Sequence, residues 1–223
     1  MTKSVLVFDF DGTLWGKTAD AIAVMLDELT ALGVKITPEL ELDLKLQWGM
    51  HFGPLRDKHF SHVSDEDMFA LFRRMDDRVR NVPYEGAAET LRLLHNRGYL
   101  LLGNTSRSRV EAMRRLSAFG MTQYITRFVS AHEIGWDRAK PSSHGLDLLL
   151  RPLEKTLGFS RTDAVLVGDA FLADRLCAKN AGIDFVVIDE EQIISRELWL
   201  EAGVRATDIL CGVRELPAWL GIA

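Results

Sequence analysis

The stretch VLVFDFDGTL, residues 5–14, carries the strongest indication of fold class in this chain. Residues 5–8 are β-branched, aliphatic or aromatic without a polar break, which is typical of a strand buried in a parallel sheet. Asp9 and Asp11 follow two residues apart, so side-chain alternation predicts that their carboxylates project in the same direction. Gly12 permits a sharp turn at the carboxyl end of the strand, where an open α/β sheet places its ligand site.

Two carboxylates held this close repel one another, which raises the pKa of at least one of them. The repulsion is relieved if a cation lies between them, or if the two groups divide the roles of nucleophile and acid/base. The segment from Asp9 to Gly12 therefore indicates a reactive or cation-binding site rather than a plain turn.

The composition is ordinary for a globular protein: 223 residues, of which 47% are hydrophobic and 26% charged. This length allows one sizeable core with a smaller accessory lobe. No window approaches about 18 uncharged apolar residues and the chain opens directly into a strand, so we expect no membrane span, no signal peptide and a cytoplasmic location. A net charge of −5 without a basic block argues against a nucleic-acid surface. Cys177 and Cys211 are expected to be buried, reduced thiols.

Beyond the first strand, the pattern predicts a helical insertion and then a return to alternating strands and helices. Helices are predicted in the insertion at 19–33, 38–48, 54–60 and 65–80. Later strands are predicted at 99–102, 128–130, 164–167, 185–188 and 208–210, and later helices at 86–97, 108–119, 143–157, 173–181 and 216–220. This alternation predicts an α/β fold with a doubly wound parallel sheet. We expect a core from residues 1–15 and 83–223 and an all-helical insertion at 16–82.

Polar side chains follow four of the predicted strands. They are Asp9 with Asp11, Asn104 to Ser106, Lys140, and Asp169 with Asp174. The carboxyl ends of parallel strands face one crevice, so three or four carboxylates and one lysine are expected to converge there. Such a group of hard oxygen ligands favours Mg²⁺, which keeps several waters and shares its coordination shell with phosphate.

Three motifs, in this order and at strand ends, resemble those of the haloacid dehalogenase-like phosphatase superfamily. They are DFDGTL at residues 9–14, Lys140-Pro141, and VGDAFLAD at 167–174 followed by AKNAG at 178–182. The resemblance runs from residue 4 to at least residue 220. The helical insertion and the return at 83–86 look like the cap of the phosphoglycolate phosphatase-like branch. The resemblance implies a Rossmann-like core that hydrolyses a small phosphomonoester.

The resemblance also implies a role for each site residue. Asp9 would attack phosphorus and form an aspartyl-phosphate, while Asp11 would protonate the leaving group and then activate water. Mg²⁺, held by Asp9, the backbone carbonyl of Asp11 and Asp169, would offset the negative charge together with Lys140. Asp174 would orient metal-bound water or Lys140 from just outside this shell.

The second motif departs from the family pattern, which places Ser or Thr at the strand end immediately before Asn. This register puts Gly103 at the hydroxyl position. Either Thr105 or Ser106 then supplies the donor to the phosphoryl oxygens, or Asn104 and backbone amides hold the phosphate alone, or activity is reduced. We expect Asn104, Thr105, Ser106 and Lys140 to bind substrate.

These observations favour a Mg²⁺-dependent phosphatase, monomeric or homodimeric, that acts on a small phosphorylated metabolite. A phosphomutase of the same superfamily is the nearest alternative, and Gly103 leaves open a catalytically weak protein that binds a phosphometabolite. A dehalogenase is disfavoured, because that reaction does not need the acid/base group that Asp11 supplies. Residues of the insertion that could contact the rest of a substrate are Lys17, His51, Arg56, Lys58 and His59.

Overall fold

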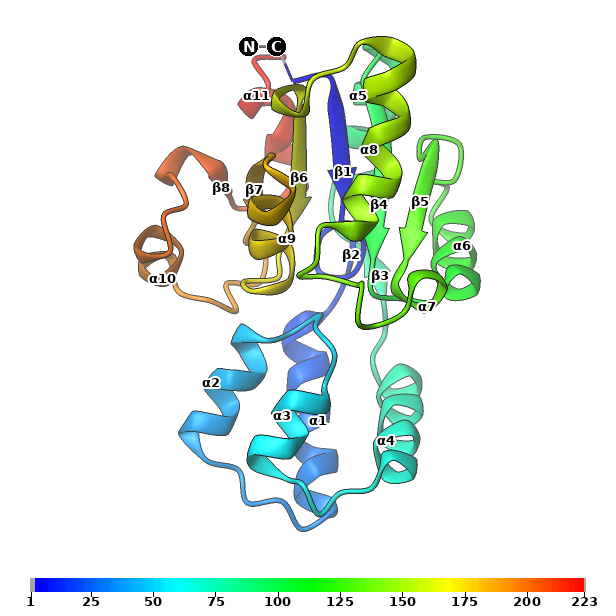
Figure 1. The fold of residues 1–223 in the computed structure, drawn as a ribbon. Coiled ribbons are helices and arrows are strands. Elements are labelled where there is room, and N and C mark those ends of the chain that lie inside the picture. Colours follow the sequence, from blue (N-terminus) through cyan, green and yellow to red (C-terminus); the bar gives the residue numbers. More distant parts are fainter. Residues whose placement is uncertain (1–2, 223) are drawn as a thin grey trace.

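Six parallel strands form the centre of the molecule, of which the computed structural model describes residues 3–222 (Figure 1). Their order in the sheet is β5-β4-β1-β6-β7-β8. The strands are β1 Val5–Phe8, β4 Leu100–Thr105, β5 Arg127–Ser130, β6 Ala164–Gly168, β7 Asp184–Ile188 and β8 Ile209–Leu210. The chain adds strands first on one side of β1 and then on the other, so the strand order reverses at β1, the position at which open α/β sheets bind ligands. The predicted doubly wound α/β sheet is confirmed.

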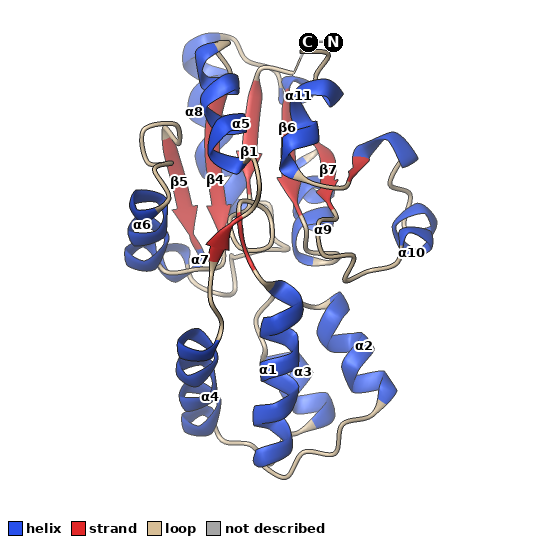
Figure 2. Cartoon of the chain, turned by 180° about the vertical axis from the view of Figure 1, so that it is seen from behind, coloured by secondary structure: helices blue, strands red, loops and turns tan. Residues whose placement is uncertain are grey.

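Alternate side chains of β1 pack against helices on opposite faces of the sheet. Leu6 and Phe8 belong to the apolar layer under α5, α6 and α11, whereas Val5 and Val7 belong to the layer under α8 and α9. Figure 1 shows α8 and α9 in front of the sheet, and Figure 2 shows α5 in front of the other face. These helices are α5 Ala87–Asn96, α6 Arg109–Ala118, α8 His144–Leu157, α9 Ala173–Ala181 and α11 Leu216–Trp219. Burial on both faces explains the unbroken apolar run in β1.

The first four of the five helices between β1 and β4 lie beyond the carboxyl edge of the sheet, apart from the layers that cover its faces (Figures 1 and 2). They are α1 Thr18–Ala31, α2 Pro38–Leu46, α3 Gly53–His59 and α4 Asp65–Arg78, which together we call the cap segment. Met25, Leu44 and Leu71, from three of these helices, are fully buried in an apolar cluster that the cap segment forms largely by itself. All four helices predicted for residues 16–82 are present.

A short antiparallel strand pair joins the two connections between the sheet and the cap segment. β2, Trp15–Gly16, pairs with β3, Val82–Pro83. Neither strand is predicted by the sequence pattern, because two residues are too few to show an alternation. The pair holds the two connecting segments side by side where the chain leaves and re-enters the core.

The longer elements agree with the sequence pattern, whereas short ones and one boundary differ. α7 Ala131–Ile134 and α10 Arg196–Glu201 are not predicted, because a helical period is not visible over four or six residues. β4 continues to Thr105 because Asn104 and Thr105 pair with β5, so polar residues of the second motif lie inside the strand. No helix among residues 3–222 combines the length and apolarity needed to cross a membrane.

The two cysteines differ in exposure. Cys177, in α9, is buried as expected. Cys211 is exposed, so the prediction of a buried thiol is wrong at this position. It comes directly after β8, the two-residue strand at the edge of the sheet.

Candidate functional site

A buried lysine joins two of the predicted carboxylates at the carboxyl end of β1. The Nζ atom of Lys140 lies 2.9 Å from Oδ1 of Asp9 and 2.7 Å from Oδ1 of Asp174. Asp9 follows β1 and Asp174 lies in the first turn of α9, so residues far apart in sequence meet where the sheet ends. Asp174 and Lys140 are almost completely shielded from solvent, with exposed fractions of 0% and 4%.

Asp169 completes a group of three carboxylates. Oxygen atoms of Asp9, Asp169 and Asp174 all lie within 4.8 Å of one another. Two glycines make room for this arrangement: a Cβ on Gly12 would lie 2.0 Å from Oδ2 of Asp169, and one on Gly168 would lie 2.3 Å from Oδ2 of Asp174. Gly12 also has a φ of +80°, which residues other than glycine rarely adopt. Glycine is therefore required where the backbone approaches these carboxylates.

The charges in this group are unbalanced. Burial raises the pKa of Asp9 to about 7, although Lys140 opposes this shift. Burial and the neighbouring Asp9 and Asp174 also raise the pKa of Asp169. Burial alone would lower the pKa of Lys140, but attraction to Asp174 and Asp9 outweighs it and raises that pKa, so the lysine stays charged. One ammonium group facing three carboxylates leaves an excess of negative charge that a divalent cation would offset.

These residues fit a hard divalent cation. The three carboxylates offer oxygen ligands within a span that a single ion could bridge, and the missing positive charge matches a doubly charged ion. The side chain of Asp174 is also engaged by Lys140 and by the backbone N–H of Ala170, 3.1 Å away. This is compatible with the predicted role of Asp174 in orienting neighbours of the ion.

Asp11 has different partners from Asp9. Its carboxylate accepts hydrogen bonds from Arg107 Nε at 2.7 Å, Arg115 Nη1 at 2.9 Å and Trp15 Nε1 at 3.0 Å. Burial would raise the pKa of Asp11, but the two arginines and the hydrogen bond from Trp15 together outweigh burial and lower it. The two carboxylates are thus relieved of charge by separate cations.

Sequence reasoning missed both arginines that hold Asp11. Arg107 follows Ser106 directly and begins the turn into α6, so a cation next to a polar strand end was a signal that could have found it. Arg115 lies in the last turn of α6 and is one of several charged residues in that helix, and only the packing of α6 on the sheet places it beside Asp11.

The proposed register of the second motif is wrong. A Cβ on Gly103 would lie 2.4 Å from Cζ of Phe10 and 2.7 Å from Cβ of Phe128, so this position faces the apolar layer under α6. Gly103 is small because two aromatic residues pack over it, and it does not stand where a phosphate-binding hydroxyl would be.

The three polar residues after Gly103 point to different neighbours. Asn104 donates its side-chain amide to Sγ of Cys177 at 3.6 Å. Ser106 donates its hydroxyl to the carbonyl oxygen of Gly49 in the cap segment at 2.7 Å. Thr105 ends β4, and its hydroxyl oxygen accepts the N–H of Arg107 at 3.1 Å, which leaves the hydroxyl proton available to an acceptor. Of the three, Thr105 is the best candidate to donate to a phosphoryl oxygen.

The cap segment reaches the loop that carries Asp169. A Cβ on Gly49, in the α2–α3 connection, would lie 3.5 Å from the Cβ atoms of Ala170 and Ala173. The backbone N–H of Leu172 donates to the carbonyl of Leu46, 3.2 Å away. The cap segment therefore contacts the core beside the carboxylate group.

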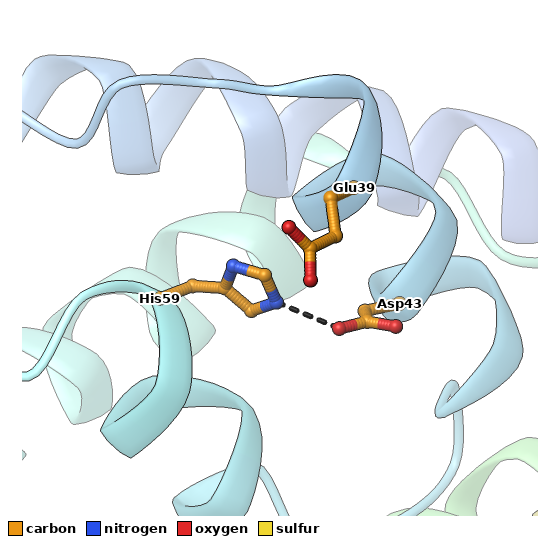
Figure 3. Close-up of side chains that lie close together, drawn as sticks. All are labelled: Glu39, Asp43 and His59. Atoms are coloured by element: carbon orange, nitrogen blue, oxygen red, sulfur yellow. Dashed lines mark hydrogen bonds and ion pairs between the residues drawn. The ribbon is translucent and has the colours of Figure 1, made fainter.

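Most of the cap residues singled out from the sequence are engaged within the cap segment. Arg56 pairs with Asp65. Figure 3 shows Glu39, Asp43 and His59 close together, with Nε2 of His59 2.7 Å from Oδ2 of Asp43.

The ammonium group of Lys58 lies 2.8 Å from Glu39 and 2.6 Å from Asp43, so this second acidic group has a cation of its own. Lys17 and His51 are exposed, and the ring of His51 packs against Trp136 with centroids 5.6 Å apart.

Comparison with known proteins extends these observations. Residues 6–188 match the family model described as haloacid dehalogenase-like hydrolase. The chain is 31% identical over 143 residues to pyrophosphatase PpaX of Halalkalibacterium halodurans. The aligned region covers 60% of this chain and 62% of that protein. It is 26% identical over 187 residues to phosphoglycolate phosphatase of Agrobacterium fabrum. That aligned region covers 79% of this chain and 76% of the relative.

Solved structures share the fold. A haloacid dehalogenase-like hydrolase from Bacteroides fragilis superposes with a TM-score of 0.75 at 18% identity, covering 96% of this chain and 99% of the other. A hydrolase of the same family from Deinococcus radiodurans was solved with bound phosphate and sodium. It superposes with a TM-score of 0.69 at 20% identity, and the alignment covers 99% of this chain and 96% of the other. The match to the family model over most of the sequence, together with this shared fold, shows that the chain belongs to the haloacid dehalogenase-like hydrolase family.

Proposed function

We propose that this protein is a Mg²⁺-dependent phosphatase that hydrolyses a small phosphomonoester through an aspartyl-phosphate on Asp9. The observation that carries the proposal is the buried contact of Lys140 with Asp9 and Asp174, next to Asp169. The relatives' names support the reaction class: a pyrophosphatase, phosphoglycolate phosphatases and a glyceraldehyde 3-phosphate phosphatase. A solved hydrolase that shares this fold was crystallised with bound phosphate.

In the proposed first half-reaction, a carboxylate oxygen of Asp9 attacks phosphorus while the ester oxygen leaves on the opposite side. Nucleophile and phosphoryl group are both anionic, and Lys140 reduces their repulsion from 2.9 Å away. Mg²⁺ held by Asp9, Asp169 and the backbone carbonyl of Asp11 supplies further positive charge when bound. The hydroxyl group of Thr105 donates a hydrogen bond to a phosphoryl oxygen.

Asp11 is the proposed acid and base. The arginines hold Asp11 as a carboxylate, so in this proposal it leaves them, takes up a proton, passes it to the departing alkoxide and later accepts one from the water that attacks the aspartyl-phosphate. This frees inorganic phosphate and restores the Asp9 carboxylate. Of the alternatives, the catalytically weak binding protein depended on Gly103, and the packing of Gly103 against Phe10 removes that basis.

The test is a screen of purified protein with Mg²⁺ against sugar phosphates, nucleotides, phosphoglycolate, glyceraldehyde 3-phosphate and pyrophosphate. We expect release of inorganic phosphate from at least one phosphomonoester, stopped by excess EDTA. Isomerisation of a sugar phosphate without free phosphate would instead identify a phosphomutase. Thermal stabilisation by these compounds without any turnover would identify a binding protein.

A further inference from the structure

Two arginines join the carboxylate of Asp11 to a residue of the cap segment. Arg107 places Nε 2.7 Å from Oδ2 of Asp11 and Nη1 3.2 Å from Oδ1 of Asp76. Arg115 places Nη1 2.9 Å from Oδ1 of Asp11, and its Nη2 lies 3.8 Å from the same oxygen of Asp76. Asp76 belongs to α4, so one ionic cluster connects a cap helix with the core.

The arginines are well shielded, whereas Asp76 is not. The side chains of Arg107 and Arg115 are 18% and 6% exposed, and that of Asp76 is 49% exposed. Two cations and two carboxylates balance in this cluster. If α4 moves away from the core, Asp76 leaves and both guanidinium groups face Asp11, with Glu111 in contact with Arg115 only at 3.9 Å.

We propose that Asp76 and Arg107 are positioning residues that make the availability of Asp11 depend on the docking of the cap segment. This inference rests on the proposed function, in which Asp11 serves the leaving group. The Asp11 carboxylate accepts hydrogen bonds from two guanidinium groups and from the indole of Trp15. Some of these hydrogen bonds must break before Asp11 can reach an ester oxygen. Asp76 shares the guanidinium donors, so its presence weakens the hold on Asp11, and its absence strengthens it.

The coupling has a clear consequence for substrates with different leaving groups. An alkyl phosphate needs a proton on its departing oxygen, whereas p-nitrophenyl phosphate has a leaving group stable enough to depart as the anion. Loss of Asp76 should therefore slow turnover of alkyl phosphates selectively. A merely structural role of Asp76 would affect both kinds of substrate alike.

The experiment compares wild type with Asp76→Asn on an alkyl phosphomonoester that the wild type hydrolyses and on p-nitrophenyl phosphate. We expect kcat for the alkyl substrate to fall about 10-fold, a part of the usual contribution of a general acid, with KM and p-nitrophenyl phosphate turnover nearly unchanged. Asp76→Glu, which keeps the charge, should restore most of the activity. Asp77→Asn, the same change at the neighbouring exposed position of α4, is the matched control and should leave both rates unchanged.

A double variant tests whether Asp76 acts through Arg107. Once Arg107→Gln has removed the shared donor, adding Asp76→Asn should change kcat little. Equal losses on both substrates, or the same loss with and without Arg107, would overturn the inference. An inactive wild type in the substrate screen would instead refute the proposed function, so the two failures are distinguishable.

Discussion

At the scale of single residues, the site depends on charges that are buried and paired in a fixed pattern. Lys140 is surrounded by Asp9 and Asp174, and the three groups come from segments that meet at the carboxyl end of β1. Asp11, two residues from Asp9, is paired with a different set of cations. In the proposed mechanism, this separation lets Asp9 attack phosphorus while Asp11 serves the leaving group.

Asp9→Asn should abolish turnover and leave the fold intact, because the amide is nearly isosteric but is not a nucleophile. We expect kcat to fall at least about 10³-fold on any accepted substrate, measured by phosphate release. Asp20→Asn, on the exposed surface of α1, is the control for the same chemical change and should keep wild-type activity. Hydrolysis by Asp9→Asn within a few-fold of wild type would exclude the covalent mechanism.

Gly103→Ala should destabilise the protein, because its Cβ would overlap the ring of Phe10 and the Cβ of Phe128. Overpacking of this kind typically costs about 1–3 kcal/mol in the free energy of unfolding, which urea titration measures. Phe10→Leu should relieve part of the conflict, so Gly103→Ala should cost less in that background. Equal stability of wild type and Gly103→Ala would show that Gly103 does not face these rings.

At the scale of elements, ion pairs hold the first and last helices of the cap segment together. Glu28 of α1 accepts hydrogen bonds from Arg74 Nε at 2.6 Å and Arg78 Nη1 at 2.8 Å, both from α4. The two helices are separated by more than 30 residues of chain, so these contacts fix the position of α4, which also carries Asp76. The elements of the cap are thereby linked to the cluster around Asp11.

Glu28→Gln should lower the free energy of unfolding by about 1 kcal/mol at neutral pH, because it removes the charge that both arginines contact. Hydrogen bonds from Arg74, then Arg78, hold the pKa of Glu28 below its ordinary value. Its contribution is therefore present above the unfolded-state pKa and is lost as the pH falls through the folded-state pKa.

Urea titrations of wild type and Glu28→Gln at several pH values measure this difference. The difference in the free energy of unfolding between wild type and Glu28→Gln should become smaller as the solution becomes acidic. Asp27→Asn removes a single contact with Arg78, and that contact is more exposed to solvent, so this variant should show a smaller loss of stability. A gap that is constant or that widens at acidic pH would contradict the assigned ion pairs.

At the scale of the whole molecule, the carboxyl edge of the sheet is where core and cap segment meet. The backbone N–H of Ala19 donates to Oε2 of Glu191 at 2.7 Å, and the hydroxyl of Tyr84 donates to the other oxygen. Ala19 lies where the chain enters the cap segment and Tyr84 where it returns, so one carboxylate from the loop after β7 contacts both connections. One carboxylate of the core thus contacts both connections to the cap segment.

Mg²⁺ should stabilise the folded protein, because it offsets the repulsion among Asp9, Asp169 and Asp174 that exists only when they are brought together. At a Mg²⁺ concentration of about 100 times Kd the gain is roughly 2.7 kcal/mol, visible as a rise in Tm. Asp169→Asn should remove most of the rise. Glu39→Gln, in the second acidic group, should leave it intact, and a rise that depends on Glu39 instead would place the ion in the cap segment.

Local patterns in the sequence predict the layout of the fold, because each long element has its own apolar period. The apolar run of β1, the helical periods between residues 18 and 78, and the alternation of strands and helices afterwards are local patterns that burial imposes on neighbouring residues. The same reasoning indicated that Asp9, Lys140, Asp169 and Asp174 come together, since the ends of parallel strands share one edge.

Contacts between side chains that are distant in sequence depend on tertiary packing. Whether Gly103 faces a phosphate or a phenyl ring depends on the packing of Phe10 and Phe128, which no local pattern contains. The pairing of Asp11 with Arg107 and Arg115, and of both with Asp76, joins residues up to 104 positions apart. Charged residues are frequent on helices, and the few that become partners are selected by how helices pack on the sheet, a property of the whole chain rather than of any segment.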